Sequence, residues 1–220
     1  MPPATNLSPP GTGHQPPATP TVFLLDDEPG MLKALTRLLK AEGFSVQAFT
    51  SAKTFLESYR PETSGCLVLD VAMPELNGME LQKRLTRSGL LVPIVFLTGH
   101  GDIPMSVQAI KAGAVDFLTK PVKDADLLRA VRAALQSAAE QRELISEISS
   151  LRQHYARLTP RESEVMAMVV AGQLNKQIAA DLGTCEHTIK VHRARVMEKM
   201  GVESVADLVR AAGRLEAGKK

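Results

Sequence analysis

Between residues 21 and 118, short runs of apolar residues alternate with stretches in which apolar residues recur every three or four positions. Short, largely apolar runs bounded by Gly, Pro, Asp or Ser are typical of buried strands. The five runs cover residues 22–25, 44–49, 66–69, 93–97 and 114–118. The pattern therefore predicts five strands in this half of the chain.

Four stretches in the same half have the spacing of a helix with one apolar face. Their apolar positions are Leu32, Leu35, Leu38 and Leu39; Met79, Leu81 and Leu85; Val107, Ala109 and Ile110; and Leu127, Leu128, Val131 and Leu135. Strands that alternate with helices form a parallel sheet with helices on both faces. We therefore predict an α/β fold with a five-stranded, doubly wound parallel sheet, in which ligands bind at the carboxyl ends of the strands.

The chain then runs from Leu135 to Pro160 without Gly or Pro. Its apolar residues recur at steps of four and three, as in a short heptad pattern. They are Leu144, Ile148, Leu151, Tyr155 and Leu158. We expect a helical linker over residues 139–157, which either pairs with its copy across a dimer or is a solvated spacer.

Four more helices are predicted beyond the linker. Thr159, Pro160 and Glu162 form an N-cap, a first-turn proline and a capping-box glutamate, so a helix begins there and ends near Gly172. The next two helices cover 175–182 and 186–200 and end at glycines, and a fourth begins at Ser204 with Asp207. Two short helices joined by a Gly-containing turn are typical of a helix-turn-helix, so we predict an all-α domain over residues 158–220.

The chain has 220 residues and a mass of 23.7 kDa, which suits two small domains. Residues 1–20 hold seven of the fourteen prolines and predict a disordered tail. No apolar run approaches the roughly 18 residues of a membrane span, and no secretion signal is evident, so we expect no membrane partner and a cytoplasmic protein. The two cysteines are too far apart to suggest a disulfide framework or a metal site.

Charge divides the chain unevenly. Residues 1–136 contain 13 basic and 13 acidic side chains, whereas residues 156–220 contain 11 basic and 8 acidic ones. Residues 187–200 alone contain four basic residues and one acidic residue. Any polyanionic partner therefore belongs to the C-terminal part of the chain.

Acidic residues gather at the predicted carboxyl ends of the strands. Asp26, Asp27 and Glu28 follow the first strand, Asp70 follows the third, and Thr98 and Lys120 follow the fourth and fifth. Crowded carboxylates repel one another, and Mg²⁺ with its preference for oxygen ligands relieves that repulsion. With a lysine and a hydroxyl opposite, the set indicates phosphoryl transfer to a carboxylate, with Asp70 as the nucleophile. Glu28 alone also fits a simple helix-capping role.

Four motifs occur in order at successive strand ends: LLDDE, LVLDVAMPELNG, FLTGHGD and DFLTKP. Residues 21–138 thereby resemble the receiver domain of two-component response regulators. The resemblance implies that Asp70 is the phosphoacceptor. It also implies that Asp26 and Asp27 hold Mg²⁺ together with Asp70 and the backbone carbonyl of Ala72, with Asp27 as a direct ligand.

The same resemblance gives roles to residues on the last two strands. Thr98 resembles the residue that hydrogen-bonds the phosphoryl group, and Lys120 resembles the lysine that pairs with it. Phe117 stands at the aromatic switch position of the family, and Pro121 resembles the cis-bonded proline.

The predicted helix 186–200 has one apolar stripe, formed by Ile189, Val196 and Met200, and a basic face that fits a major groove. The candidate DNA-binding residues are Lys190, Val191, Arg193, Ala194, Arg195 and Lys199. Residues 156–213 resemble the LuxR/FixJ-type DNA-binding domain almost end to end. Combined with the receiver and the linker, this resemblance indicates the FixJ-like subgroup.

Together, the resemblances imply a DNA-binding response regulator and not an enzyme. We expect a sensor histidine kinase to phosphorylate Asp70, the protein to dimerise on double-stranded DNA, and RNA polymerase to be its partner in activating transcription. One alternative is a phosphorylation-independent regulator whose receiver only dimerises. Another is a phosphate-ester hydrolase, which would need a second carboxylate where the chain has Ala72.

Overall fold

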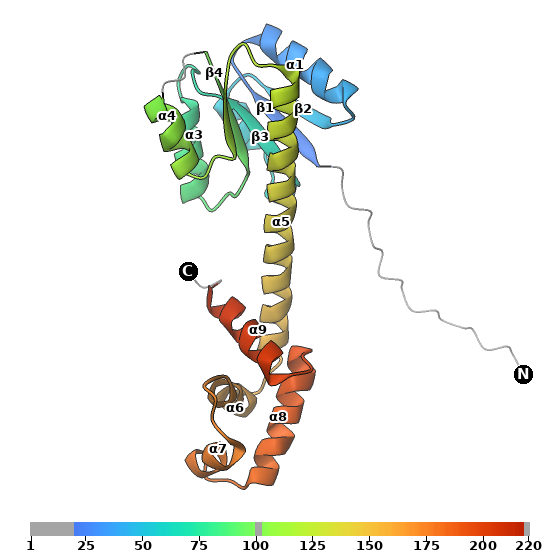
Figure 1. Ribbon diagram of the computed structural model, residues 1–220, viewed down its shortest axis with the longest axis vertical. Coiled ribbons are helices and arrows are strands. Elements are labelled where there is room, and N and C mark those ends of the chain that lie inside the picture. The colour runs from blue at the N-terminus through green and yellow to red at the C-terminus, as the bar shows by residue number, and fades with distance from the viewer. Residues whose placement is uncertain (1–19, 100–102, 218–220) are drawn as a thin grey trace, which may run out of the picture. The chain divides into compact units, whose positions relative to one another are not determined.

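The computed structural model describes residues 20–99 and 103–217 (Figure 1). The chain divides at Glu140 into two compact units, and each is described by itself below. The tail predicted for residues 1–20 lies outside the described residues, apart from Pro20. No helix among the described residues is apolar over enough of its length to cross a membrane.

The first unit is built on a five-stranded parallel sheet with the strand order β2-β1-β3-β4-β5. Its strands are β1 (Thr21–Leu25), β2 (Ser45–Phe49), β3 (Gly65–Asp70), β4 (Ile94–Thr98) and β5 (Asp116–Thr119). The three central strands are buried at every position, because helices cover both faces of the sheet, whereas the edge strands β2 and β5 are partly exposed. The predicted doubly wound parallel sheet is confirmed.

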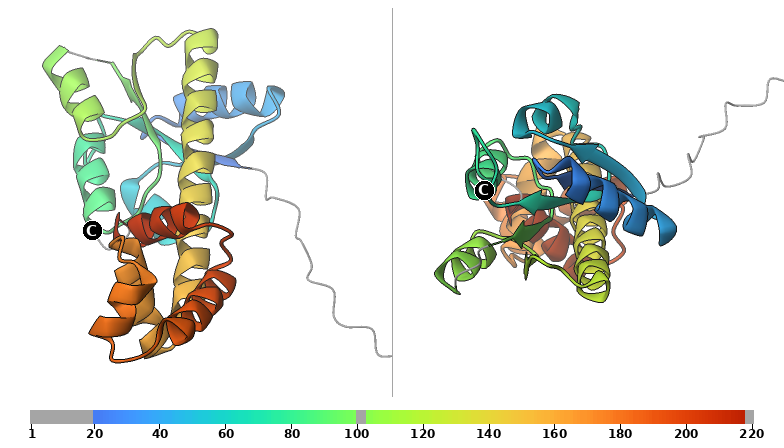
Figure 2. Two further views of the ribbon diagram at one scale, coloured as in Figure 1. Left: turned by 60° about the horizontal axis from the view of Figure 1, so that its bottom comes forward. Right: turned by 90° about the horizontal axis from the view of Figure 1, so that it is seen from above.

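Helices pack on both faces of this sheet, as the views in Figure 2 show. The helices of this unit begin with α1 (Pro29–Ala41), α2 (Ala52–Ser58), α3 (Gly78–Arg87) and α4 (Ile103–Lys111), and the fifth, α5 (Asp124–Ala156), continues into the second unit. Buried residues of α1 and α5 form one core with alternate residues of the strands, and α2, α3 and α4 contribute to the other. The two cores account for the apolar faces predicted on α1, α3 and α5. On α4 the prediction was only partly right, because Ala109 is buried whereas Val107 and Ile110 are exposed.

Helix α2 was not among the helices predicted from the sequence. It has only seven residues, and only Ala52 and Phe55 are buried, so it is too short to show a helical period. Its start is marked by Ser51, whose hydroxyl oxygen accepts a hydrogen bond from the backbone N–H of Thr54 at 3.3 Å. The ring of Phe55 packs edge-on to Phe23 of β1, with 5.8 Å between centroids. Aromatic packing against β1 therefore stabilises a helix that has little helical pattern in its own sequence.

Up to residue 217, where the described part of the chain ends, the second unit contains four helices beyond α5: α6 (Pro160–Val170), α7 (Asn175–Asp181), α8 (Glu186–Met200) and α9 (Val205–Ala217). They enclose one apolar core, to which α8 contributes Ile189, Val196 and Met200 as predicted. The predicted all-α, four-helix arrangement is therefore confirmed. The predicted helical linker is confirmed too, because α5 is a single helix of 33 residues.

The apolar stripe on the last part of α5 is not a uniform seam. Leu151 and Leu158 pack against the core of α6 to α9, whereas Leu144 is half-exposed at 52%. Ile145, beside Leu144, is similarly exposed. The C-terminal part of the stripe therefore buries its leucines against α6 to α9, whereas Leu144, and also Tyr155 at 44%, keep exposed surface.

The two cysteines are free thiols in contrasting surroundings. Cys66 lies in β3 and is fully buried, and this burial raises the pKa of its thiol to about 12. Cys185 precedes α8 and is exposed. Hydrogen bonding between its sulfur and the Thr188 hydroxyl, 3.2 Å apart, lowers the pKa of the Cys185 thiol.

Candidate metal centre and nucleic-acid interface

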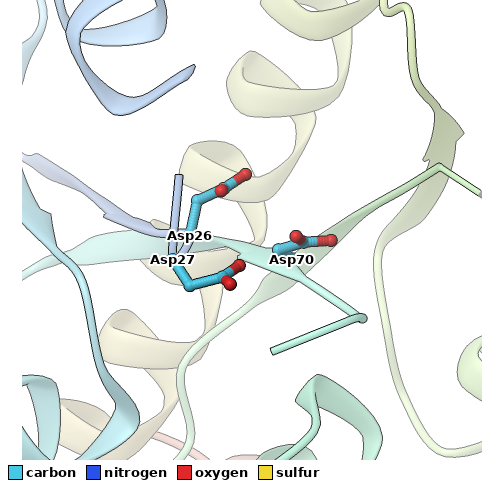
Figure 3. A group of neighbouring side chains, drawn as sticks. All are labelled: Asp26, Asp27 and Asp70. Atoms are coloured by element: carbon cyan, nitrogen blue, oxygen red, sulfur yellow. The ribbon is translucent and has the colours of Figure 1, made fainter. Parts of the chain in front are cut away.

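Three aspartates meet at the carboxyl ends of β1 and β3. Leu25 and Leu69 are paired neighbours in the sheet, so Asp26 and Asp70, which follow them, lie side by side. One carboxylate oxygen from each of Asp26, Asp27 and Asp70 lies within 4.8 Å of the other two, and Figure 3 shows the three side chains as close neighbours. Asp26 and Asp70 are only 2% and 3% exposed, and Asp27 is half-buried.

Lys120 completes this cluster from the turn between β5 and α5. Its ammonium nitrogen lies 2.7 Å from Oδ2 of Asp26 and 3.0 Å from Oδ2 of Asp70. Desolvation acts to lower the pKa of Lys120, but the hydrogen bonds to the two aspartates outweigh it, and the pKa is raised above its usual 10.5. The peptide bond between Lys120 and Pro121 is cis, as the resemblance implied.

The charge balance of this cluster favours a cation. Three carboxylates face one ammonium group, so the site has an excess of negative charge when all of these groups are ionised. An all-oxygen donor set of carboxylates suits Mg²⁺, which binds through a few carboxylates and keeps several waters. The residues present therefore fit the magnesium site expected from the sequence.

The loop after β3 is held tightly against Asp70. The backbone N–H of Ala72 donates to Oδ1 of Asp70 at 3.3 Å, and that of Gly78 donates to the carbonyl of Val71 at 3.0 Å. A Cβ at Gly78 would lie 2.5 Å from the carbonyl oxygen of Asp70, so only glycine fits there. The carbonyl of Ala72 as a metal ligand stays a prediction.

Thr98 and Phe117 lie on the two strands beyond Asp70. Thr98 ends β4, next to β3, and is buried; its carbonyl accepts a hydrogen bond from the N–H of Lys120 at 2.6 Å. Phe117 is a half-buried residue of β5, and its ring lies 6.1 Å from that of Phe96. The structure thus brings Asp26, Asp27, Asp70 and Lys120 together and sets Thr98 and Phe117 on the adjoining strands.

On α8, the candidate DNA-binding residues differ in their surroundings. Lys190, Val191, Ala194 and Arg195 are exposed, on the opposite side from the buried stripe. Arg193 is half-buried, and its Nη1 donates to Oδ1 of Asn175 in α7 at 2.5 Å. Only the first four therefore project freely from the helix.

Lys199 has a partner that the sequence did not reveal. Its Nζ lies 2.6 Å from Oε2 of Glu162, a side chain that is only 3% exposed. Glu162 also accepts a hydrogen bond from the N–H of Thr159 at 2.8 Å, as part of the predicted capping box. The hydrogen bond from Lys199, followed by that from Thr159, lowers the pKa of Glu162 to about 2. No local pattern in the sequence indicates this pair, because 37 positions separate the two residues.

Two family models match the chain. Residues 22–132 match the response regulator receiver domain, and residues 156–212 match the luxR family of bacterial regulatory proteins. The chain is a two-component response regulator. Its effector part is a LuxR-type DNA-binding domain, and as a response regulator of this type it is a regulator of transcription.

Full-length relatives support this membership. The response regulator is 46% identical to the response regulator protein TodT of Pseudomonas putida over 206 residues, which cover 94% of this chain and 91% of TodT. It is 42% identical to the transcriptional regulatory protein FixJ of Azorhizobium caulinodans over 191 residues, which cover 87% of this chain and 90% of FixJ. Both relatives are named as regulators, not as enzymes.

A solved structure matches most of the chain. The low-resolution structure of the response regulator StyR is 47% identical, covers 90% of this response regulator and 100% of the StyR chain, and gives a TM-score of 0.79. The family of receiver domains implies a histidine kinase as the partner of this response regulator, and the luxR-family match implies that it binds DNA.

Proposed function

We propose that a sensor histidine kinase phosphorylates this protein on Asp70, and that the phosphorylated protein dimerises, binds DNA with two half-sites and activates transcription. The observation that carries the proposal is the position of the Asp70 carboxylate, which lies among two further carboxylates and the ammonium of Lys120. Such a site would operate in the cytoplasm, where kinase, DNA and RNA polymerase meet.

In the proposed transfer, a carboxylate oxygen of Asp70 attacks the phosphorus of a phosphohistidine, and the P–N bond breaks as the P–O bond forms. Asp26, Asp27, Asp70 and the carbonyl of Ala72 would hold Mg²⁺, which neutralises charge on the transferred group. Lys120 already contacts Asp70, so its ammonium is placed to pair with a phosphoryl oxygen. The hydroxyl of Thr98, at the end of the adjoining strand, would donate a hydrogen bond to another.

We propose that Thr98 and Phe117 shift when Asp70 is phosphorylated. Their shift would alter a dimerisation surface on the outer face of β5 and α5. Helix α4, which packs against β5, exposes Ile103, Val107 and Ile110, and Ile103 is 80% exposed. These side chains recur at helical spacing on one apolar face, and covering it in a dimer would remove it from water. The phosphoryl group need only bias two receiver states by a typical coupling of about 1 to 3 kcal/mol.

For DNA binding we propose that α8 enters the major groove. Lys190 would contact a base edge or a phosphate, Val191 and Ala194 would contact thymine methyl groups, and Arg193 and Arg195 would contact phosphates. The ion pair with Glu162 makes Lys199 a stabilising residue first, so we place it at the margin of this interface.

The test is the solution mass, by light scattering, of wild type and Asp70→Asn with Mg²⁺, each with and without beryllofluoride. The proposal expects the mimic to convert wild type from monomer to dimer and to leave Asp70→Asn a monomer. If wild type is a dimer without the mimic and Asp70→Asn binds DNA normally, the receiver is only a dimerisation module. If the mimic binds and wild type stays monomeric, dimerisation is not the output.

A further inference from the structure

The side chain of Asn175 links the first residue of α7 to α8. Its amide oxygen accepts a hydrogen bond from Nη1 of Arg193, with 2.5 Å between the two atoms. Both side chains are half-buried, whereas Lys190 and Arg195 on the same helix are exposed. Arg193 is therefore held in place by a neighbouring helix.

Asn175 does not perform the usual task of an asparagine at a helix start, which is to cap the first turn. The capping position belongs to Leu174, which has no polar side-chain atom. The N–H of Leu174 instead donates to the side-chain oxygen of Gln177 at 2.8 Å. The amide oxygen of Asn175 is thus directed to another helix, and its interaction with Arg193 needs an explanation of its own.

The chemistry of the pair suits an arginine that binds an anion. The guanidinium of Arg193 has five N–H donors in a fixed plane, so a single acceptor orients the group and leaves donors for a ligand. An uncharged amide leaves the positive charge of Arg193 intact, whereas a carboxylate would cancel it. Because a long side chain loses rotamer freedom on binding, orienting it beforehand decreases that cost.

We propose that Asn175 is a positioning residue for DNA binding, which holds the guanidinium of Arg193 ready for a backbone phosphate without neutralising its charge. This inference rests on one part of the proposed function, which is that α8 binds DNA. Phosphate contacts are independent of sequence, so a duplex of random sequence is a sufficient probe.

The first experiment measures binding of the full-length protein, with Mg²⁺ and beryllofluoride, to a short random-sequence duplex over a range of KCl concentrations. It compares wild type, Asn175→Ala, Arg193→Ala and the double variant. Arg193→Ala weakens binding about tenfold and lowers the steepness of the log-log salt dependence by about 0.9, the value for one lost phosphate contact. Asn175→Ala weakens wild type several-fold but has no further effect on Arg193→Ala, because it acts through that residue.

The second experiment uses Asn175→Asp, which keeps the acceptor and adds a charge. The new ion pair maintains thermal stability, yet DNA affinity falls below that of Asn175→Ala because the carboxylate cancels the charge of Arg193 and repels phosphate. Gln153→Glu is the matched control: it makes the same charge change at an exposed position of α5 and leaves DNA affinity near wild type. If the link between Asn175 and Arg193 is merely structural, Asn175→Asp should instead keep both thermal stability and DNA affinity near the wild-type values.

The outcomes separate the two proposals. Additive losses in the double variant, or wild-type DNA affinity in Asn175→Asp, overturn the positioning role and leave DNA binding by α8 in place. A wild-type protein that binds no duplex at low salt overturns the proposed function and, with it, this inference.

Discussion

Lys199 of α8 forms an ion pair with Glu162 of α6, with 2.6 Å between the ammonium nitrogen and a carboxylate oxygen. Glu162 is buried, and it also caps the start of its own helix through the N–H of Thr159. One side chain therefore fixes the start of α6 and joins it to the last turn of α8. A lysine that the sequence suggests for phosphate binding thus serves first to join two helices.

Replacing Lys199 by Met removes the partner of a buried carboxylate. We expect Lys199→Met to destabilise the second unit by roughly 3 kcal/mol, because the charge of Glu162 is left uncompensated. Calorimetric unfolding of the full chain measures the loss. Arg195→Ala is the comparison: Arg195 is exposed, so its removal weakens DNA binding with little change in stability. An unchanged melting temperature in Lys199→Met with a shallower salt dependence of DNA binding would show that Lys199 contacts phosphate.

We expect the stability of the second unit to depend on pH through Glu162. The pKa of Glu162 is about 2 in the folded protein and has an ordinary value of 4.5, so the unfolded chain binds the proton more readily. The stabilisation by Glu162 is therefore present above pH about 4.5 and is lost as the pH falls toward about 2. Urea unfolding as a function of pH checks this dependence.

In that titration, Glu162→Gln should be less stable than wild type at neutral pH, and the difference should shrink as the pH falls. The control is Glu164→Gln on the same helix, which breaks an exposed pair with Arg161 at 3.0 Å. Exposed pairs contribute about 0 to 1 kcal/mol, so this variant should follow the wild-type curve. A constant difference between Glu162→Gln and wild type at all pH values would contradict the lowered pKa.

The third prediction concerns the ammonium of Lys120. In Lys120→Met, the buried carboxylates of Asp26 and Asp70 lose their cationic partner, and the receiver should lose roughly 3 kcal/mol of stability without divalent cations. Mg²⁺ should then stabilise the variant more than wild type, because it restores the missing positive charge. Thermal unfolding with EDTA and with Mg²⁺ measures both effects. Lys123→Met, at an exposed position, is the control. Equal stabilisation of wild type and Lys120→Met by Mg²⁺ would contradict the prediction.

The fourth prediction tests Asp27 as a direct ligand of Mg²⁺. We expect Asp27→Asn to weaken Mg²⁺ binding by about tenfold or more, because it removes a charged oxygen ligand. Without Mg²⁺ the same variant should be at least as stable as wild type, since one of three neighbouring carboxylates is gone. Calorimetric titration with MgCl₂ measures the affinity, with the exposed Asp124→Asn as control. Wild-type affinity in Asp27→Asn would assign the metal to Asp26 and Asp70 alone.

The elements that could be predicted from the sequence are those whose signals are local. Buried strands, and helices with several turns of apolar spacing, were foreseen, and the carboxylates at the strand ends do meet, because adjacent parallel strands end at one edge. Helix α2 was missed because two buried residues do not define a period. The partners of Lys199 and Arg193 could not be predicted, since each lies on another helix at a distance that side-chain packing alone decides.

Because one thiol is buried and the other is exposed, their alkylation can report on both units of the protein. Cys66 lies inside the first unit and its thiol remains protonated at neutral pH, so an alkylating reagent reaches it only when the receiver opens. Cys185 stands exposed beside the first turn of α8, where bound DNA would shield it. One alkylation time course, resolved by peptide, would therefore record the opening of the receiver and the occupancy of the DNA-binding helix in the same sample, with no residue added or replaced.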